Sequence, residues 1–162
     1  MNKEQASVQE FMLAFGQECP DRPCIPPEDT CNFRVDFITE ENLELDIAFQ
    51  DKNITLVADA LADILYVTYG TAIACGLDME RIFAEVHRSN MSKFWNSMEV
   101  ASRFNRDAQE LYQQNDGDIV FKVDDLIAKK IGKNRWIVKN TNHKVIKSPS
   151  YSPADISSKL VI

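Results

Sequence analysis

Glycine is scarce in this sequence, with 5 residues among 162, and no Gly-x-x-x-x-Gly-Lys pattern occurs. A loop that cradles phosphates with its backbone depends on such glycines, so a P-loop is excluded. If the protein handles phosphates, metal ions must therefore replace a glycine-rich loop.

Long apolar runs are also missing, since no stretch approaches 18 consecutive apolar residues. The N-terminus has no apolar segment followed by a small-residue cleavage site. The most apolar stretch, Ala58 to Leu77, contains Asp59 and Asp63 and predicts a buried helix of a soluble protein. We therefore expect a cytoplasmic protein with no membrane partner.

Positive charge is in deficit: 18 Lys and Arg face 25 Asp and Glu, giving a net charge of −7. A surface that binds duplex DNA or RNA needs clustered Lys and Arg, so nucleic acid is not expected as a partner. Carboxylates that face a polyanionic ligand need divalent cations between them. The acidity therefore indicates a metal if the ligand carries phosphates.

Cysteines are few, at positions 19, 24, 31 and 75, and nothing else indicates an oxidising compartment. A zinc site built on Cys19, Cys24 and Cys31 would need a fourth ligand and usually a tighter Cys-x₂₋₄-Cys pair. We expect free thiols.

What the sequence does contain is the material of one soluble globular domain, with 44% hydrophobic and 27% charged residues over a length typical of single domains. A capping box of Ser7 and Glu10 and helical spacing predict a first helix near 5–18. Four prolines make residues 19–31 an irregular connection.

Two longer helices should follow this connection. The pattern over 33–49 predicts an amphipathic helix. After a turn at 51–53, the run 54–75 is apolar nearly all round, which predicts a central helix buried by neighbours on several sides and ended by Gly76.

The remaining third of the chain gives weaker signals. Asp78 can cap a fourth helix that runs through Lys93 into Trp95. Residues 99–113 are compatible with a helix, and 123–131 suggest another short one. The apolar runs 136–138 and 145–146, separated by polar residues 140–142, suggest a small β-hairpin or an extended excursion.

An acidic constellation spans the two longer helices. Glu41 and Glu44 share a helix face at spacing i, i+3, with Glu40 on an adjoining edge, and Asp59 and Asp63 share a face at i, i+4. Antiparallel helices joined by a short turn would bring these faces together. Such carboxylates repel one another unless Mg²⁺ or Mn²⁺ lies among them.

Two plainer interpretations stay open for these acids. The three glutamates could be a solvated helix face. The aspartates interrupt the most apolar helix, where a buried carboxylate must be paired or bound to metal, so they could instead form salt bridges with Lys or Arg.

These residues resemble a known family. The segments 33–34, 38–45, 58–70 and 85–93, with 147–156 near the end, are similar to the MazG-like and phosphoribosyl-ATP-pyrophosphohydrolase-like group of all-α NTP pyrophosphohydrolases. The resemblance implies an all-α bundle of four to five helices in a single domain, 1–162. Its helical core would cover about 5–95, an insertion about 96–141 and a closing segment about 142–162.

Members of that group bind catalytic Mg²⁺ with a Glu-x-x-Glu motif followed by Glu-x-x-Asp. Glu41 and Glu44 match the first motif and Asp63 matches the last aspartate, but Ala60 stands where the second motif has Glu. Asp59 lies one turn from Asp63 and is our expected replacement ligand. The implied metal ligands are Glu41, Glu44, Asp59 and Asp63.

The resemblance implies cleavage of the α–β phosphoanhydride of (deoxy)nucleoside triphosphates, giving a monophosphate and pyrophosphate. The implied catalytic residues are Glu41 and Glu40, the latter as the base that accepts a proton from water. His87 is interpreted as a surface or packing residue. The implied substrate contacts are Arg34, Tyr66, Arg88, Asn90, Lys93, Lys147 and Tyr151.

Two other functions stay open. Ala60 motivates a helical regulatory module that binds a nucleotide or metal without turnover, and solvated acidic faces would suit a structural helical oligomer. In the enzyme hypothesis we expect a homodimer or homotetramer, because the central helix has more apolar surface than one thin bundle covers.

Overall fold

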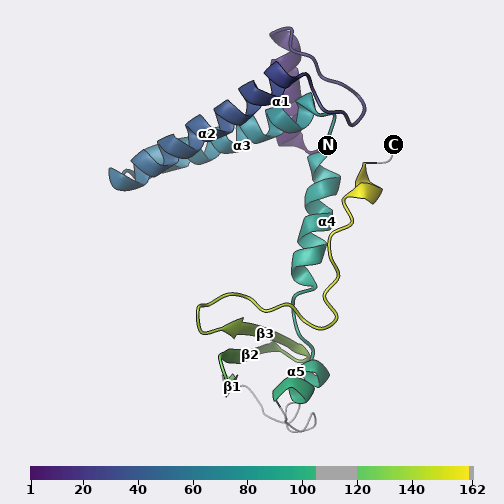
Figure 1. Cartoon of the computed structure of the whole chain (residues 1–162). Helices are drawn as coiled ribbons and strands as arrows, with labels where there is room; N and C mark the ends of the chain where they lie inside the picture. Colours follow the sequence, from purple (N-terminus) through teal and green to yellow (C-terminus); the bar gives the residue numbers. More distant parts are fainter. Residues whose placement is uncertain (105–119, 161–162) are drawn as a thin grey trace. The chain divides into compact units, whose positions relative to one another are not determined.

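The structure is a computed structural model that describes residues 1–104 and 120–160. The chain divides into two compact units, each described here by itself (Figure 1). The helical unit comprises Met1–Phe83 and Ile156–Ile162, and the mixed unit comprises Ala84–Asp155. Helix α4 (Met79–Met91) contains the boundary between them.

Helix α1 (Lys3–Ala14) begins earlier than the capping box predicted. Asn2 caps it, its side chain accepting a hydrogen bond from the Gln5 amide at 2.9 Å. Ser7 lies inside the helix, where its hydroxyl donates to the Lys3 carbonyl. The helix predicted near 5–18 is therefore present over Lys3–Ala14, but the predicted capping box is wrong, because the amide side chain of Asn2 provides the cap.

Helix α2 (Glu28–Gln50) also begins before its expected position. It starts directly after Pro27, whose carbonyl accepts the first helical hydrogen bond, from Cys31. Proline suits this position because its fixed φ is compatible with the helix start and no donor is lost from the helix interior. The irregular proline-rich connection is confirmed, but it ends at Pro27.

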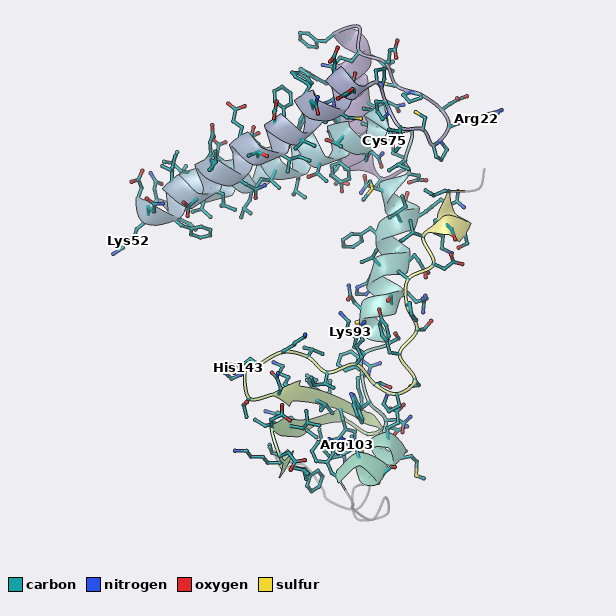
Figure 2. The ribbon with its side chains drawn as sticks, in the orientation of Figure 1. Arg22, Lys52, Cys75, Lys93, Arg103 and His143 are labelled. Atoms are coloured by element: carbon teal, nitrogen blue, oxygen red, sulfur yellow. The ribbon has the colours of Figure 1, made fainter. Side chains whose placement is uncertain are left out.

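A tight turn joins α2 to helix α3 (Ile54–Ala74), as predicted (Figure 1). Lys52 adopts a positive φ of 51° in this turn, and Asn53 caps α3 by accepting from the amides of Thr55 and Leu56. The far end of α3 stops at Cys75, followed by Gly76 with φ of 64°; Figure 2 labels Lys52 and Cys75 at the two ends of the helix. Gly76 therefore ends the helix as expected.

Helix α3 packs against both α1 and α2, and its Ile73 and Ala74 form a core cluster with Val8 and Met12 of α1. Its other side is open: Leu61 and Leu65 are 47% and 58% exposed. Within one chain, the predicted burial on several sides is therefore wrong. By length and composition alone α3 could cross a membrane, a property that core helices of soluble proteins share.

The mixed unit contains helix α5 and a three-stranded antiparallel sheet in the order β1-β2-β3. The elements are α5 (Ser97–Phe104), β1 (Val120–Val123), β2 (Leu126–Gly132) and β3 (Arg135–Asn140). The helix predicted over 123–131 is wrong, because this segment turns at Asp124 and continues as a strand. The predicted all-α class thus holds for the helical unit only, and the part of the 99–113 prediction beyond Phe104 lies outside the described residues.

The core of the mixed unit forms around Trp95 and Trp136, which are 5% and 0% exposed. Their backbones exchange two hydrogen bonds, of 3.1 and 2.9 Å. The predicted continuation of α4 into Trp95 is wrong, since the helix ends at Met91 and Trp95 pairs as a β-bridge. The hairpin predicted around 140–142 is confirmed in part by a bridge between Lys139 and Val145.

Candidate active site

The acidic constellation of the helical unit gathers around Glu41. This side chain is partly buried, and its pKa is raised by burial and then by the charges of four neighbouring carboxylates. In decreasing order of effect these neighbours are Asp63, Glu44, Glu40 and Asp59. The two helices therefore bring all five predicted acids close enough to interact.

The surroundings of the two aspartates differ from the expectation. Asp59 and Asp63 are exposed in the single chain, so the argument that they are buried inside an apolar helix is wrong. Ion pairs among the described residues include those of the N-terminus with Asp78 and Glu80 and of Arg88 with Glu85, and none of these involves Asp59 or Asp63. Within that part of the chain, neither aspartate is neutralised by Lys or Arg.

Ala60, which stands where the second motif has Glu, is buried in the hairpin of α2 and α3. Ala60 is 3% exposed and lines a cavity of about 190 Å³ between α2 and α3 together with Ala48, Asp59 and Glu44. A longer side chain at position 60 would occupy this space. Asp59 and Glu44, one from each helix, therefore border the same small cavity.

The donor set fits a hard divalent cation, because all five groups are carboxylates and Mg²⁺ prefers oxygen ligands. In the described part of the chain, however, no three His, Cys, Asp or Glu side chains stand close enough to hold a metal as they are placed. The carboxylates are neighbours that would have to rotate toward a shared ion.

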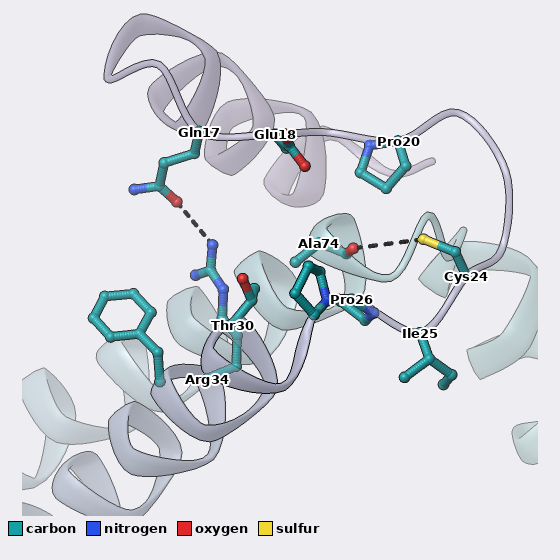
Figure 3. A pocket seen from close by; sticks show the side chains of 11 residues that line it. Gln17, Glu18, Pro20, Cys24, Ile25, Pro26, Thr30, Arg34 and Ala74 are labelled. Carbon is teal, nitrogen blue, oxygen red and sulfur yellow. Dashed lines mark hydrogen bonds between the residues drawn. The ribbon is translucent and has the colours of Figure 1, made fainter.

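Arg34 points into a second cavity of the helical unit, of about 450 Å³ (Figure 3). The side chain is 8% exposed, and its Nη2 donates to Gln17 Oε1 at 2.7 Å, while its buried Nε has no hydrogen-bond partner among the described residues. Burial lowers the pKa of Arg34. Arg34 and Glu41 are seven residues apart on α2, which places them on one face at about 10 Å along the axis.

Tyr66, the other predicted substrate contact in this unit, packs against α1. Its ring meets that of Phe11 edge-on at a centroid distance of 5.8 Å, and the residue is 40% exposed. Packing with Phe11 accounts for its present orientation.

In the mixed unit, Arg88 is engaged by a neighbour that the sequence analysis missed. Glu85, which is 7% exposed, accepts two hydrogen bonds from Arg88 at 2.8 and 3.0 Å, and one from the Asp155 amide at 2.9 Å. Arg88 also donates to the Pro153 carbonyl at 2.9 Å. The i, i+3 spacing of Glu85 and Arg88 could have revealed the pair.

The segment around Tyr151 is thereby fastened to α4. The Tyr151 hydroxyl lies 3.1 Å from Ser89 Oγ, and Ser92 Oγ bonds to the backbone of Ser152. Lys147 Nζ stands 4.2 Å from the centre of the Tyr151 ring. Hydrogen bonding to Ser89, followed by the charge of Lys147, lowers the pKa of Tyr151.

The last two predicted contacts meet each other. Lys93 Nζ donates to Asn90 Oδ1 at 2.6 Å, and both residues border a cavity of about 330 Å³ with Phe94, Ile137 and Lys139. His87 is exposed on α4, as expected. The predicted site residues thus fall into two groups, one in each unit.

Comparison with known proteins agrees with the helical part of this description. A search of curated proteins found no match. The family model for phosphoribosyl-ATP pyrophosphohydrolase matches residues 8–90, just over half of the chain, and includes all five acids with Arg34, Tyr66, Arg88 and Asn90. The chain therefore belongs to the phosphoribosyl-ATP pyrophosphohydrolase family.

Proposed function

We propose that this protein hydrolyses (deoxy)nucleoside triphosphates to a nucleoside monophosphate and pyrophosphate, with Mg²⁺ or Mn²⁺ held by Glu41, Glu44, Asp59 and Asp63. The observation that carries the proposal is the raised pKa of Glu41 among four carboxylates, within the segment that matches a pyrophosphohydrolase family. The family's name specifies phosphoribosyl-ATP, itself a triphosphate, and our proposal covers the wider class.

The reaction divides between metal and protein. When bound, Mg²⁺ supplies charge neutralisation for the phosphates and lowers the pKa of a water. Glu40, exposed beside Glu41, accepts a proton from the water as the water oxygen bonds to the α-phosphorus. The bridging P–O bond breaks, and its electron pair leaves with pyrophosphate.

The proposed substrate contacts of the mixed unit are supported by different features of their surroundings. Asn90 and Lys93 border a cavity with an apolar wall, as a nucleotide contact requires. Lys147 and Tyr151 present a cation and a hydroxyl side by side. Arg88 already donates hydrogen bonds to Glu85 and to the Pro153 carbonyl. A contact with a substrate phosphate would therefore be an additional role of its guanidinium.

A homodimer or homotetramer is part of the proposal. The uncovered leucines of α3 support it, since 28% of the apolar window of this helix is buried within the chain. Large apolar faces of this kind are usually covered by another subunit.

Release of pyrophosphate in the presence of Mg²⁺ tests the function. We expect Glu44→Gln to lower the rate by at least roughly 10- to 100-fold, the range for groups that support a metal. Asp46→Asn is the matched control, because Asp46 lies on the same helix and its described hydrogen bond is to the surface residue Gln50. Equal activity of Glu44→Gln and the control would refute the assignment.

The alternative of a non-catalytic binding module rests on Ala60. It predicts that Mg²⁺ with a non-hydrolysable triphosphate raises the melting temperature while no monophosphate is formed from any (d)NTP. A purely structural oligomer predicts neither stabilisation nor product.

A further inference from the structure

The cavity beside Arg34 contains a cation without an anionic partner. Its walls come from the connection after α1, the first turns of α2 and the end of α3 (Figure 3). Arg34 is more than nine-tenths buried, and its contacts, which include the neutral Gln17 amide, the Met12 sulfur and the Phe33 ring, carry no negative charge. A buried charge of this kind is costly until a counter-charge joins it.

The acidic residues nearby do not supply that counter-charge. Glu18 borders the cavity but is exposed, and among the described residues no carboxylate lies within ion-pair distance of Arg34. After burial, the influences on the pKa of Arg34 within the described part of the chain come from the thiols Cys19 and Cys75, and burial raises the pKa of both thiols. Neutral thiols leave the guanidinium uncompensated.

The start of α2 adds a second feature that favours an anion. Pro26, Pro27 and Thr30 border the cavity, and α2 begins there with no side-chain cap; the acids of its first turn, Glu28 and Asp29, do not line the cavity. The first amides of a helix lack partners within it, and the helix dipole makes this end positive. A buried guanidinium and an uncapped end of a long helix therefore face one cavity.

We propose that this cavity binds a small organic anion, a phosphomonoester with a ring-sized apolar body. The anionic group would compensate Arg34 at the start of α2, and the body would lie against Pro20, Ile25 and Phe33, which form the apolar wall. A volume of about 450 Å³ admits more than a phosphate alone and suits a nucleoside monophosphate. The carboxylates of the metal site take no part, so binding needs no Mg²⁺.

Thr30 allows a sharp test, because it precedes Arg34 by one helical turn and borders the same cavity (Figure 3). Glutamate at position 30 would provide an internal counter-charge with the favourable i, i+4 order and at the favourable end of the helix. Thr30→Glu should therefore fold, melt at a higher temperature than wild type and exclude the ligand. Thr30→Gln is the matched neutral control.

The experiment titrates the full-length protein, without divalent metal, with AMP, inorganic phosphate and adenosine, by calorimetry and thermal shift. We expect AMP to bind more tightly than phosphate, and adenosine to bind least. Thr30→Glu should weaken the binding of AMP at least about tenfold through like-charge repulsion, while the affinity of Thr30→Gln for AMP should stay close to that of wild type. Arg34→Met should also lose AMP binding.

The proposal is overturned if wild type does not bind AMP, or if Thr30→Glu binds it as well as Thr30→Gln does. These results are independent of hydrolysis: Glu44→Gln should keep metal-free AMP binding whether or not the protein is a pyrophosphohydrolase. Kinetics with a triphosphate substrate then identify the source of the anion that binds beside Arg34. If Thr30→Glu raises the KM for the triphosphate, the anion is a group of the substrate. If the KM is unchanged but AMP no longer inhibits, the anion belongs to a separate ligand.

Discussion

The guanidinium of Arg34 lies directly against the backbone of Gly70. A Cβ built on Gly70 would stand 3.0 Å from Arg34 Nη1 and 3.8 Å from the Met12 sulfur. Glycine inside a helix is normally unfavourable by about 1 kcal/mol relative to alanine. The presence of Gly70 inside α3, near its C-terminal end, is explained by the space that the buried arginine needs.

Gly70→Ala should therefore destabilise the protein despite its better helix propensity, by about 1–3 kcal/mol in urea unfolding, the usual effect of overpacking. In an Arg34→Met background the loss of stability caused by Gly70→Ala should shrink or reverse, because the flexible methionine side chain can move away from the added methyl group. Ala58→Gly, at an exposed position of α3, measures the propensity difference alone. The explanation fails if Gly70→Ala has the same effect in both backgrounds.

Glu41→Gln should raise the melting temperature of the metal-free protein while abolishing stabilisation by Mg²⁺. Because the folded-state pKa of Glu41 is raised, its contribution to stability is present at acid pH and lost as pH rises through the folded pKa. The glutamine variant should lack this loss. Melting curves from about pH 4 to pH 7, with and without Mg²⁺, measure both effects; lower metal-free stability of the variant at neutral pH would contradict the reasoning.

Glu85→Gln should loosen residues 153–155 from α4, since Glu85 binds both Arg88 and the Asp155 amide. Hydrogen exchange at Asp155 is the direct measurement, and we expect faster exchange together with a stability loss of about 1–3 kcal/mol. Arg88→Lys keeps the charge but loses the two-pronged geometry, so it should give a smaller effect. Unchanged exchange at Asp155 in Glu85→Gln would be incompatible with this contact network.

Glu99 should make the mixed unit sensitive to acid. Burial acts to raise its pKa, but hydrogen bonds from Ser150, Asn96 and Ser148 outweigh this and hold the pKa below its usual value. A depressed carboxyl pKa contributes stability above the unfolded-state value and loses it as pH falls through the folded-state value. Glu99→Gln should flatten that acid loss in pH-dependent melting, whereas an equally steep loss would assign it to other groups.

The helical hairpin could be predicted from the sequence because its signals are local. Asn53 and Gly76 delimit α3 by side-chain capping and backbone freedom, both readable from a few residues. The spacing of the five acids follows from helix geometry in the same way. The solvent exposure of Asp59 and Asp63 could not be predicted in this way, because it depends on which other helices cover α3.

The strand β2 shows the opposite case. Its apolar residues fit a helical period as well as alternation, and pairing with the neighbouring strands β1 and β3 decides between them. The contact of Arg34 with Gln17 was also hidden, since the two residues meet across a proline-rich connection whose course no periodic pattern defines. Both features depend on tertiary contacts.

The paired backbones of Trp95 and Trp136 make everything between them a side excursion of the chain. The chain passes Trp95 shortly after the end of α4, returns to it at Trp136 and continues from there toward the segment at Tyr151. Glu99 lies inside this excursion and accepts hydrogen bonds from Ser148 and Ser150 beyond it, so a lengthened or exchanged excursion must retain this carboxylate if the two serines are to keep their partner.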